Sequence, residues 1–328
     1  MSIRHSCFLT SLILLLAALL APRTALAAGF GAGDLLTLAT PAVSPPIDHY
    51  LLLRVGVPAG DIDTLVNLPT GNTPKALSVS PIDGKVYVLC NNSIVRVDVC
   101  NGTVSTVTSG TNFPTAPNAG ILAHSNGQLY VSRGLRIYTV NPTTGAQSPF
   151  ADLTSLGVGA TNLREGRDHQ IYVATNGGSG LLPWVVRLDP VTAASQVLAK
   201  FNIQSTNVRD VAIDTRDSVY VLRAGFEIVV NRTNPVAQTI GPLITFTDGG
   251  SAAGWIAGHP DGGIYHPHSS AVGQMGILRI DPVSATTTAL VPQQNKISMG
   301  GLDVARLSVP CSTPAHRSTW GEVKARYR

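Results

Sequence analysis

The sequence is poor in charge, because Asp, Glu, Lys and Arg make up only 13% of its 328 residues. It has no run rich in Lys and Arg, so we expect no nucleic-acid partner, since surfaces that bind nucleic acids concentrate these residues. Few charged residues together with much Gly, Pro, Thr, Ser and Val favour strands over helices. The composition therefore predicts an all-β protein that does not bind nucleic acid.

The short motifs of common catalytic sites are also missing. The sequence has no Gly-x-Ser-x-Gly, no phosphate-binding loop and no Cys-x-x-Cys, which excludes the usual nucleophile elbow, a nucleotide loop and a cysteine-based metal site. Function must therefore be argued from the fold and from isolated polar residues.

Cysteine is scarce, with four residues in the whole chain. Cys7 lies in the N-terminal segment discussed next. Cys90 and Cys100 cannot pair if Asn91-Asn92 is a hairpin turn, because Cys100 then lies roughly 23 Å along the strand from the residue facing Cys90. A Cys100–Cys311 disulfide and free thiols both remain open.

Only one long hydrophobic run is present, at residues 8–20. It follows the basic Arg4 and precedes a small-x-small site at 25–27, so residues 1–27 are predicted to be a secretory signal peptide. The run is too short for a membrane anchor, which needs roughly 20 apolar residues, and no transmembrane segment follows. Cleavage removes Arg4 and Arg23 and lowers the formal net charge from +4 to +2. We expect export to the periplasm or the extracellular space.

A repeat of about 45 residues fills the body of the chain. Its best-defined part is a predicted hairpin at 83–98, DGKVYVLCNNSIVRVD, whose pattern returns around five tyrosines: Tyr87, Tyr130, Tyr172, Tyr220 and Tyr265. Each tyrosine has an apolar stretch before it and two further predicted strands after it. The stretches before it are expected to be innermost strands at 76–79, 120–123, 162–165, 210–213 and 255–258. Four short strands in this period predict a β-propeller blade, with the tyrosines packing between blades.

The two ends of the repeat region complement each other. Residues 33–38, 50–55 and 63–68 match the second, third and fourth strands of a blade, whereas 301–307 matches a first strand with nothing after it. Pairing the ends completes a sixth blade and removes open sheet edges. We therefore predict an all-β, six-bladed propeller at 28–310, closed by N-terminal strands and one C-terminal strand.

With these blades in view, the chain resembles six-bladed propellers of the NHL-repeat type and their TolB-like relatives. The resemblance rests on the Pro-Asp-Gly-x-hydrophobic-Tyr pattern, as in HPDGGIY at 259–265 and SPIDGKVYV at 80–88. The relatives include the SMP-30/gluconolactonase group, streptogramin-lyase-like proteins and sugar-dehydrogenase propellers. The resemblance implies architecture rather than activity, because propellers host binding, hydrolysis, lyase and redox chemistry alike.

Two polar residues occupy the position before an expected innermost strand, near one mouth of the channel. Asn162 and Asp210 fall in neighbouring blades, and their oxygens could bind a hard cation such as calcium. The lactonase resemblance implies a third ligand, a glutamate, but Glu165 has the wrong alternation to share a face with Asn162.

Arg164 and Arg209 flank this pair. They could neutralise Asp210 or bind an anionic ligand. Asn162, Arg164, Arg209 and Asp210 are therefore the candidate ligand-binding residues at the channel mouth.

A second candidate metal site is His266-Pro267-His268. The two histidines are spaced to share one face of a strand, which would suit zinc or iron. Pro267 predicts an irregular strand exit, and ordinary loop histidines are the alternative.

The chain is thus divided into a signal peptide (1–27), a propeller (28–310) and a tail (311–328). Trp320, Val323 and Tyr327 could share one side of a helical turn in the tail, which could pack on the propeller, bind a partner or lack fixed structure. We expect a binding scaffold whose ligand is a protein, a peptide, a carbohydrate or a small molecule. The alternative is a metal-dependent hydrolase or lyase of the lactonase kind, with calcium at Asn162 and Asp210.

Overall fold

The computed structural model describes residues 29–41, 50–69, 73–110, 119–177, 182–201, 207–224, 228–246, 254–269, 274–295 and 297–311. The expected signal peptide and the expected helical turn in the tail lie outside these residues. Apart from the short 3-10 helix η1 (Thr154–Leu156), the described elements are strands. No helical segment among the described residues has the length and hydrophobicity needed to span a bilayer.

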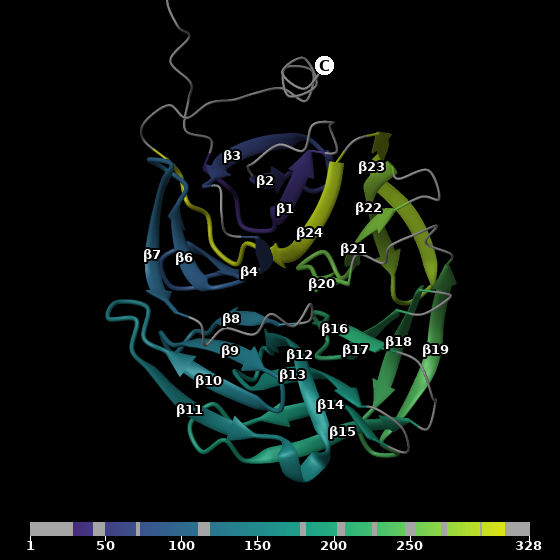
Figure 1. Cartoon of the computed structure of the whole chain (residues 1–328). Coiled ribbons are helices and arrows are strands. Elements are labelled where there is room, and N and C mark those ends of the chain that lie inside the picture. Colours follow the sequence, from purple (N-terminus) through teal and green to yellow (C-terminus); the bar gives the residue numbers. More distant parts are fainter. Residues whose placement is uncertain are drawn as a thin grey trace, which may run out of the picture.

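Six antiparallel sheets of four strands form a ring around a central channel (Figure 1). We number these blades in chain order. Blade 1 contains β24 (Ile297–Val304), β1 (Leu35–Pro41), β2 (Tyr50–Val55) and β3 (Ile62–Leu68). Blade 2 contains β4 (Pro74–Val79), β5 (Val86–Cys90), β6 (Ser93–Asp98) and β7 (Thr103–Ser109). Blade 3 contains β8 (Ile121–Ala123), β9 (Leu129–Arg133), β10 (Arg136–Val140) and β11 (Gln147–Asp152).

The other three blades follow the same order from the channel outwards. Blade 4 contains β12 (Val158–Glu165), β13 (Ile171–Gly177), β14 (Leu182–Leu188) and β15 (Ser195–Phe201). Blade 5 contains β16 (Asn207–Ile213), β17 (Val219–Ala224), β18 (Ile228–Asn234) and β19 (Thr239–Phe246). Blade 6 contains β20 (Ala257–Gly258), β21 (Ile264–Ser269), β22 (Gln274–Asp281) and β23 (Thr286–Asn295). The predicted six-bladed propeller is confirmed.

The ring closes as predicted, by pairing the two ends of the chain. The C-terminal β24 pairs antiparallel with β1, from Val304 opposite Leu35 to Ile297 opposite Pro41. Phe30 and Val309 extend this contact through a further bridge. Strand β24 begins at Ile297, four residues before the expected start. The closure completes blade 1 as a four-stranded sheet like the other five.

The tyrosines of the repeat fill the spaces between blades. All five are buried, and each belongs to a core shared with the following blade. For example, Tyr87 packs with Ile121 of blade 3, and Tyr265 packs with Leu35 of blade 1. Six such cores, one at each blade interface, bury the apolar faces of the strands. The structural role expected for the tyrosines is therefore confirmed.

Two histidines add polar contacts between blades at the turns before these tyrosines. His124 Nε2 lies 3.0 Å from the carbonyl of His169 in blade 4, and His259 Nε2 lies 2.6 Å from the carbonyl of Gly33 in blade 1. The Nδ1 atom of each ring accepts the backbone N–H two residues later. That pattern puts the proton of the neutral ring on Nε2, which then donates to the neighbouring blade.

A disulfide joins Cys100, just after β6, to Cys311, which follows the closing strand. It resolves the alternatives left open by the sequence, and Cys90 is a buried free thiol. The bond links residues 211 positions apart, so in the chain-entropy model it restricts the unfolded chain by on the order of 5 kcal/mol.

We expect that replacing both Cys100 and Cys311 with Ser lowers the free energy of unfolding by about 2–5 kcal/mol. Denaturant unfolding with and without reductant measures this. The reductant should destabilise the wild type and leave the double variant unchanged. An equal response of the two proteins to reductant would contradict a bond between these cysteines.

Candidate functional site

A bulge shapes the first strand of several blades and corrects the expected strand starts. In β4, β12, β16 and β24 the strand register shifts by one residue at Lys75, Thr161, Arg209 and Gly301, respectively. The expectation that Asn162 and Asp210 precede their strands is wrong, because β12 begins at Val158 and β16 at Asn207. Each of the two residues directly follows the bulge. Bulges turn side chains away from the regular alternation of a strand.

Arg164 of β12 reaches across the channel to three other blades. Its Nη2 donates to Asp210 Oδ2 of blade 5 at 2.8 Å and to the carbonyl of Ile256 beside blade 6 at 3.0 Å. Nη2 also lies 2.8 Å from the carbonyl of Leu302 in blade 1, and Nη1 donates to Asp303 at 3.2 Å. Burial lowers the pKa of Arg164, but the charges of Asp210 and Asp303 outweigh it and raise the pKa above its ordinary value. The guanidinium is therefore a permanent cation that holds four blades together.

The same network continues into the remaining two blades. Asp303 Oδ2 accepts the backbone N–H of Val79 at 2.8 Å and the hydroxyl of Ser78 at 3.1 Å, both in blade 2. The Ser78 hydroxyl in turn accepts the N–H of Ala123 in blade 3 at 3.0 Å. A continuous chain of hydrogen bonds thus joins all six blades through the centre of the ring.

The structure brings together only two of the four candidate ligand-binding residues. Arg164 and Asp210 form the buried ion pair, so the neutralising role suggested for Arg164 is present. Asn162 Oδ1 instead accepts the N–H of Leu163 at 2.9 Å, and Arg209 packs beside Gly254.

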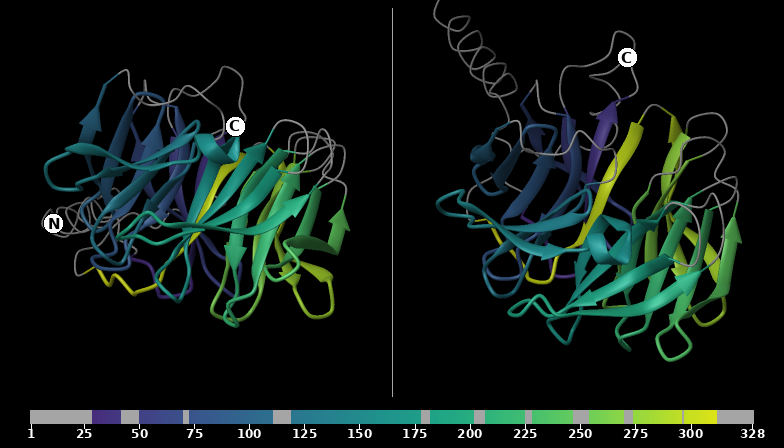
Figure 2. Two further views of the ribbon diagram at one scale, coloured as in Figure 1. Left: turned by 90° about the horizontal axis from the view of Figure 1, so that it is seen from below. Right: turned by 60° about the horizontal axis from the view of Figure 1, so that its bottom comes forward.

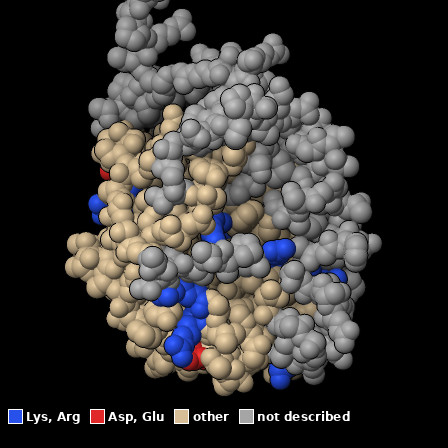
Figure 3. Space-filling view, in the orientation of Figure 1, with Lys and Arg blue, Asp and Glu red and all other residues tan. Residues whose placement is uncertain are grey.

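Burial lowers the pKa of Arg209 and of Lys75, which come from the starting ends of their strands. Figure 3 views that face, where Lys and Arg outnumber Asp and Glu on the described surface.

Asp210 has other partners at the position proposed for calcium. Both of its carboxylate oxygens accept protein N–H groups, from Val211, from Ile256 and from Arg164. Across the described part of the chain, no three His, Cys, Asp or Glu side chains are arranged to hold a metal ion.

The His266-Pro267-His268 segment lies within a regular strand. Strand β21 continues through Pro267 to Ser269 with an unbroken register against β22, so the expected irregular exit is wrong. His266 is fully buried, and its Nδ1 lies 2.9 Å from the carbonyl of Trp255.

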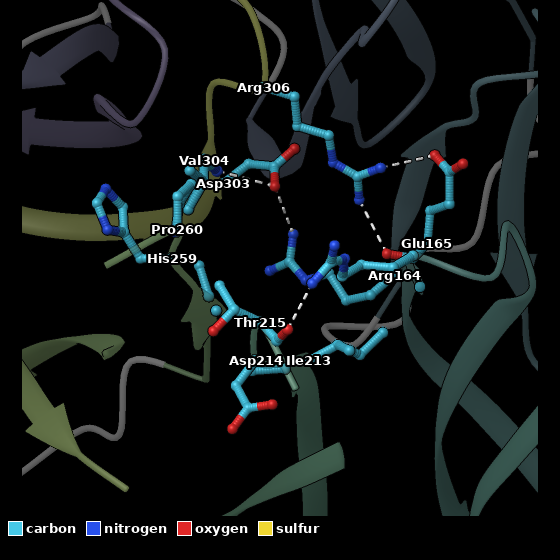
Figure 4. A pocket seen from close by; sticks show the side chains of 15 residues that line it. Arg164, Glu165, Ile213, Asp214, Thr215, His259, Pro260, Asp303, Val304 and Arg306 are labelled. Atoms are coloured by element: carbon cyan, nitrogen blue, oxygen red, sulfur yellow. Dashed lines mark hydrogen bonds and ion pairs between the residues drawn. The ribbon is translucent and has the colours of Figure 1, made fainter. Parts of the chain in front are cut away.

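A second polar cluster lies at the other end of β12, around Glu165, a residue that the sequence analysis considered only as a ligand beside Asn162. The Glu165 side chain is fully buried and accepts hydrogen bonds from Ser125 of blade 3 at 2.5 Å and from Arg306 beyond β24 at 2.9 Å. His169 Nδ1 lies 2.9 Å from the same carboxylate, and Arg306 also donates to the Glu165 carbonyl (Figure 4). Alternation along one strand could not reveal this cluster, since its partners come from three separate segments.

The cluster has the residue types of a catalytic triad but different connections. In a triad, histidine stands between the acid and the serine. Here the Ser125 hydroxyl contacts Glu165 directly, and His169 Nδ1 faces both of them, 3.0 Å from the hydroxyl. Burial raises the pKa of Glu165, yet the charge of Arg306 and the bonds from Ser125 and His169 lower it overall. A carboxylate with a lowered pKa is a weak base, so this cluster acts as a clamp between blades.

A pocket of about 410 Å³ opens at this mouth, where β12, β16, β20 and β24 end. The mostly buried Arg164 and Asp303 lie at its floor, and the more exposed Arg306 lies at its rim (Figure 4). Arg167 also lines the pocket and is exposed, so it belongs to the rim. Arg167 Nη1 donates to the carbonyl of Thr215 at 2.5 Å and so connects blades 4 and 5. The short turns around the pocket lie on the face turned away from the viewer in Figure 1, as the edge-on view in Figure 2 shows. The site is therefore at the mouth opposite the one expected from the sequence.

No protein-family model matches this sequence, and no curated protein gives a significant match. Solved structures do match the fold. TolB from Acinetobacter baumannii has a TM-score of 0.63 and 12% identity over 83% of this chain and 66% of its own. A chain in a nidogen–laminin complex has a TM-score of 0.59 and 13% identity over 83% of this chain and 98% of its own.

The periplasmic gluconolactonase of Pseudomonas aeruginosa is similar to the same extent. Its TM-score is 0.55, with 12% identity over 83% of this chain and 99% of its own. At these identities the likeness defines the chain as a six-bladed β-propeller and goes no further, because this fold serves unrelated functions. The resemblance to the NHL-repeat group in particular stays a prediction.

We expect Arg164→Met to lower the free energy of unfolding by about 3–5 kcal/mol, because it leaves Asp210 and Asp303 as buried charges without their cation. Denaturant unfolding of the variant at neutral pH measures the loss. Adding Asp210→Leu should recover part of it, since the two residues share one network.

The matched control is Arg136→Met, which breaks an exposed ion pair with Asp152 and should cost far less, because solvent screens such pairs. Equal losses in the two single variants would contradict a central role for Arg164.

The Glu165 clamp predicts a specific dependence on pH. Because the folded protein lowers the pKa of Glu165 from its ordinary 4.5, the clamp stabilises the fold fully above pH 4.5 and less as pH falls through the lowered value. Glu165→Gln should therefore lower the free energy of unfolding by about 1–3 kcal/mol at pH 7. The difference in this free energy between the variant and the wild type should become smaller at acidic pH. Unfolding curves at a series of pH values test this, and a difference that is constant with pH would contradict it.

Proposed function

We propose that this protein is an exported propeller that acts as a binding scaffold and takes a small ligand in the pocket at the end of β12, β16, β20 and β24. The pocket itself carries the proposal. It has a volume of about 410 Å³, within the range of sites for small molecules, and four blades converge on it. Arg164 and Asp303 of the central network line the pocket and are mostly buried, so a ligand would meet them at its floor.

The carboxylates around the pocket support binding over catalysis. A general acid or base works best with a pKa near the working pH. Glu165 and Asp214 both line the pocket, and both have a lowered pKa. For Asp214, burial raises the pKa, but hydrogen bonds from Ser218 and Arg216 outweigh it. Such groups are suited to holding structure and charge rather than to transferring protons.

Two observations support export. The Cys100–Cys311 disulfide is of a kind that persists in oxidising compartments such as the periplasm or the cell exterior. The N-terminal 27 residues have the pattern of a secretory signal. A periplasmic gluconolactonase shares the fold, which is consistent with this location.

The alternative is a metal-dependent hydrolase or lyase. The gluconolactonases from Pseudomonas aeruginosa and Xanthomonas campestris share the propeller fold, but fold alone does not carry activity. The hydrogen bonds to both oxygens of Asp210 favour a structural role for this residue, so we place the ligand in the opposite mouth.

A pocket-blocking variant tests the proposed site. Thr215→Trp puts a large ring into the lining of the pocket. We expect the mature wild-type protein to be stabilised by at least one compound in a thermal-shift panel of small molecules, and we expect this variant to lose the shift.

The matched control is Val191→Trp, at a turn residue that is 86% exposed. It should retain the shift. A panel without any binder, or binding that Thr215→Trp leaves intact, would contradict the proposed site.

A further inference from the structure

The charges that a ligand in the pocket would meet are mainly positive. The side chain of Arg306 is 43% exposed, and Arg167 is exposed at the rim. In contrast, the carboxylates of Glu165 and Asp214 are fully buried, and Asp303 is 16% exposed. The lining thus has buried anions behind accessible cations.

The hydrogen bonds of the lining residues increase this difference between the carboxylates and the arginines. The carboxylate of Glu165 accepts hydrogen bonds from Ser125 and Arg306. The carboxylate of Asp303 accepts hydrogen bonds from four residues, which are Val79, Ser78, Val304 and Arg164. The guanidinium of Arg306 has five N–H donors and uses two of its nitrogens on Glu165. Donors therefore remain for a ligand, whereas the carboxylate oxygens are engaged.

Arg164 provides an independent observation at the pocket floor. Its side chain is only 9% exposed, and its Nε is shielded from solvent without a hydrogen-bond partner among the described groups. Because solvent cannot reach this Nε, a ligand in the pocket cannot reach it either, and the other two nitrogens of Arg164 are held by Asp210, Asp303 and backbone carbonyls. Arg164 lines the pocket, so its guanidinium forms part of the floor and contributes positive charge there.

The rim cations are also held in place before any ligand arrives. Arg306 is fixed by two contacts to Glu165, one to the carboxylate and one to the backbone carbonyl. Arg167 is fixed by its bond to Thr215. Side chains already ordered in the free protein lose little entropy on binding.

We propose that the pocket binds the anionic oxygens of a small organic acid, with Arg306 and Arg167 at the rim and Arg164 at the floor. Guanidinium groups match both carboxylate and phosphate oxygens through paired N–H donors. The remainder of the ligand would contact the apolar walls formed by Ala212, Ile213 and Val304. This inference rests on the proposed function and names the class of ligand.

The experiment titrates the mature protein with succinate, citrate, inorganic phosphate and the uncharged succinamide, at constant ionic strength. Isothermal calorimetry or NMR measures the affinities. We expect saturable binding of at least one anion and none of succinamide. Preference for succinate and citrate would assign a carboxylate site, and preference for phosphate would assign a phosphate ester. No saturable binding of any anion would overturn the inference.

Substitutions of the rim arginines test where the anion binds. Arg306→Gln should weaken binding at least tenfold, and Arg306→Lys should weaken it less, because it keeps the charge and loses the paired donors. Arg167→Gln tests the rim without touching the Glu165 clamp. Arg136→Gln, which makes the same charge change away from the pocket, should bind like wild type. Equal affinities in Arg136→Gln and both rim Gln variants would overturn the inference.

The two proposals fail in different ways. If only uncharged compounds bind, and Thr215→Trp abolishes their binding, the scaffold proposal stands and the organic-acid inference falls. If anions bind equally well to wild type and Thr215→Trp, both the pocket and its ligand class are wrong.

Discussion

Within the described part of the chain, the guanidinium of Arg164 joins four blades of the ring directly. Each blade packs its apolar faces only against its two neighbours, so hydrophobic cores alone hold the ring as a chain of pairwise contacts. Arg164 instead bonds from blade 4 to blades 5, 6 and 1, and Asp303 extends the connection to blades 2 and 3. Such a buried charge persists only because every branch of the network ends on a carboxylate or a carbonyl. The relative position of these blades thus depends on the contacts of one side chain, Arg164.

This network also decides where a ligand can bind. Its hydrogen bonds cross the centre of the ring, and the pocket lies at the mouth where Arg164 and Asp303 form part of the lining. Asp210 and Asp303 lie in the interior of the ring, where they neutralise Arg164. Arg167 and Arg306 instead connect neighbouring blades at the rim of the pocket. The positive surface of the pocket follows from this arrangement, because the same contacts that close the ring bury the acids and leave guanidinium edges accessible.

The sequence predicted the blades and the ring closure, because both follow from patterns that repeat. The tyrosine period marked five blades, and the incomplete ends, 33–68 and 301–307, marked the sixth. It did not predict the strand starts in blades 4 and 5, because Thr161 and Arg209 are bulge residues that no local pattern reveals. The site was predicted only in part, since Arg164 and Asp210 do meet, but the partners of Glu165 come from residues 125, 169 and 306. Contacts between such distant segments cannot be read from alternation within one strand.

Two of the four blades that build the pocket depart from the repeat. Three residues before the tyrosine, blades 2, 3 and 6 have glycine with positive φ, whereas blades 4 and 5 have His169 and Asp217 at φ of 58° and 59°. Side chains in this conformation cost roughly 1–2 kcal/mol, so a repeat under selection for stability alone would favour glycine. His169 recovers part of that cost through Glu165. Blades 4 and 5 also supply Arg164, Arg167 and Asp210. The positive φ of His169 is thus linked to the Glu165 cluster beside the pocket, which a glycine at this position could not join.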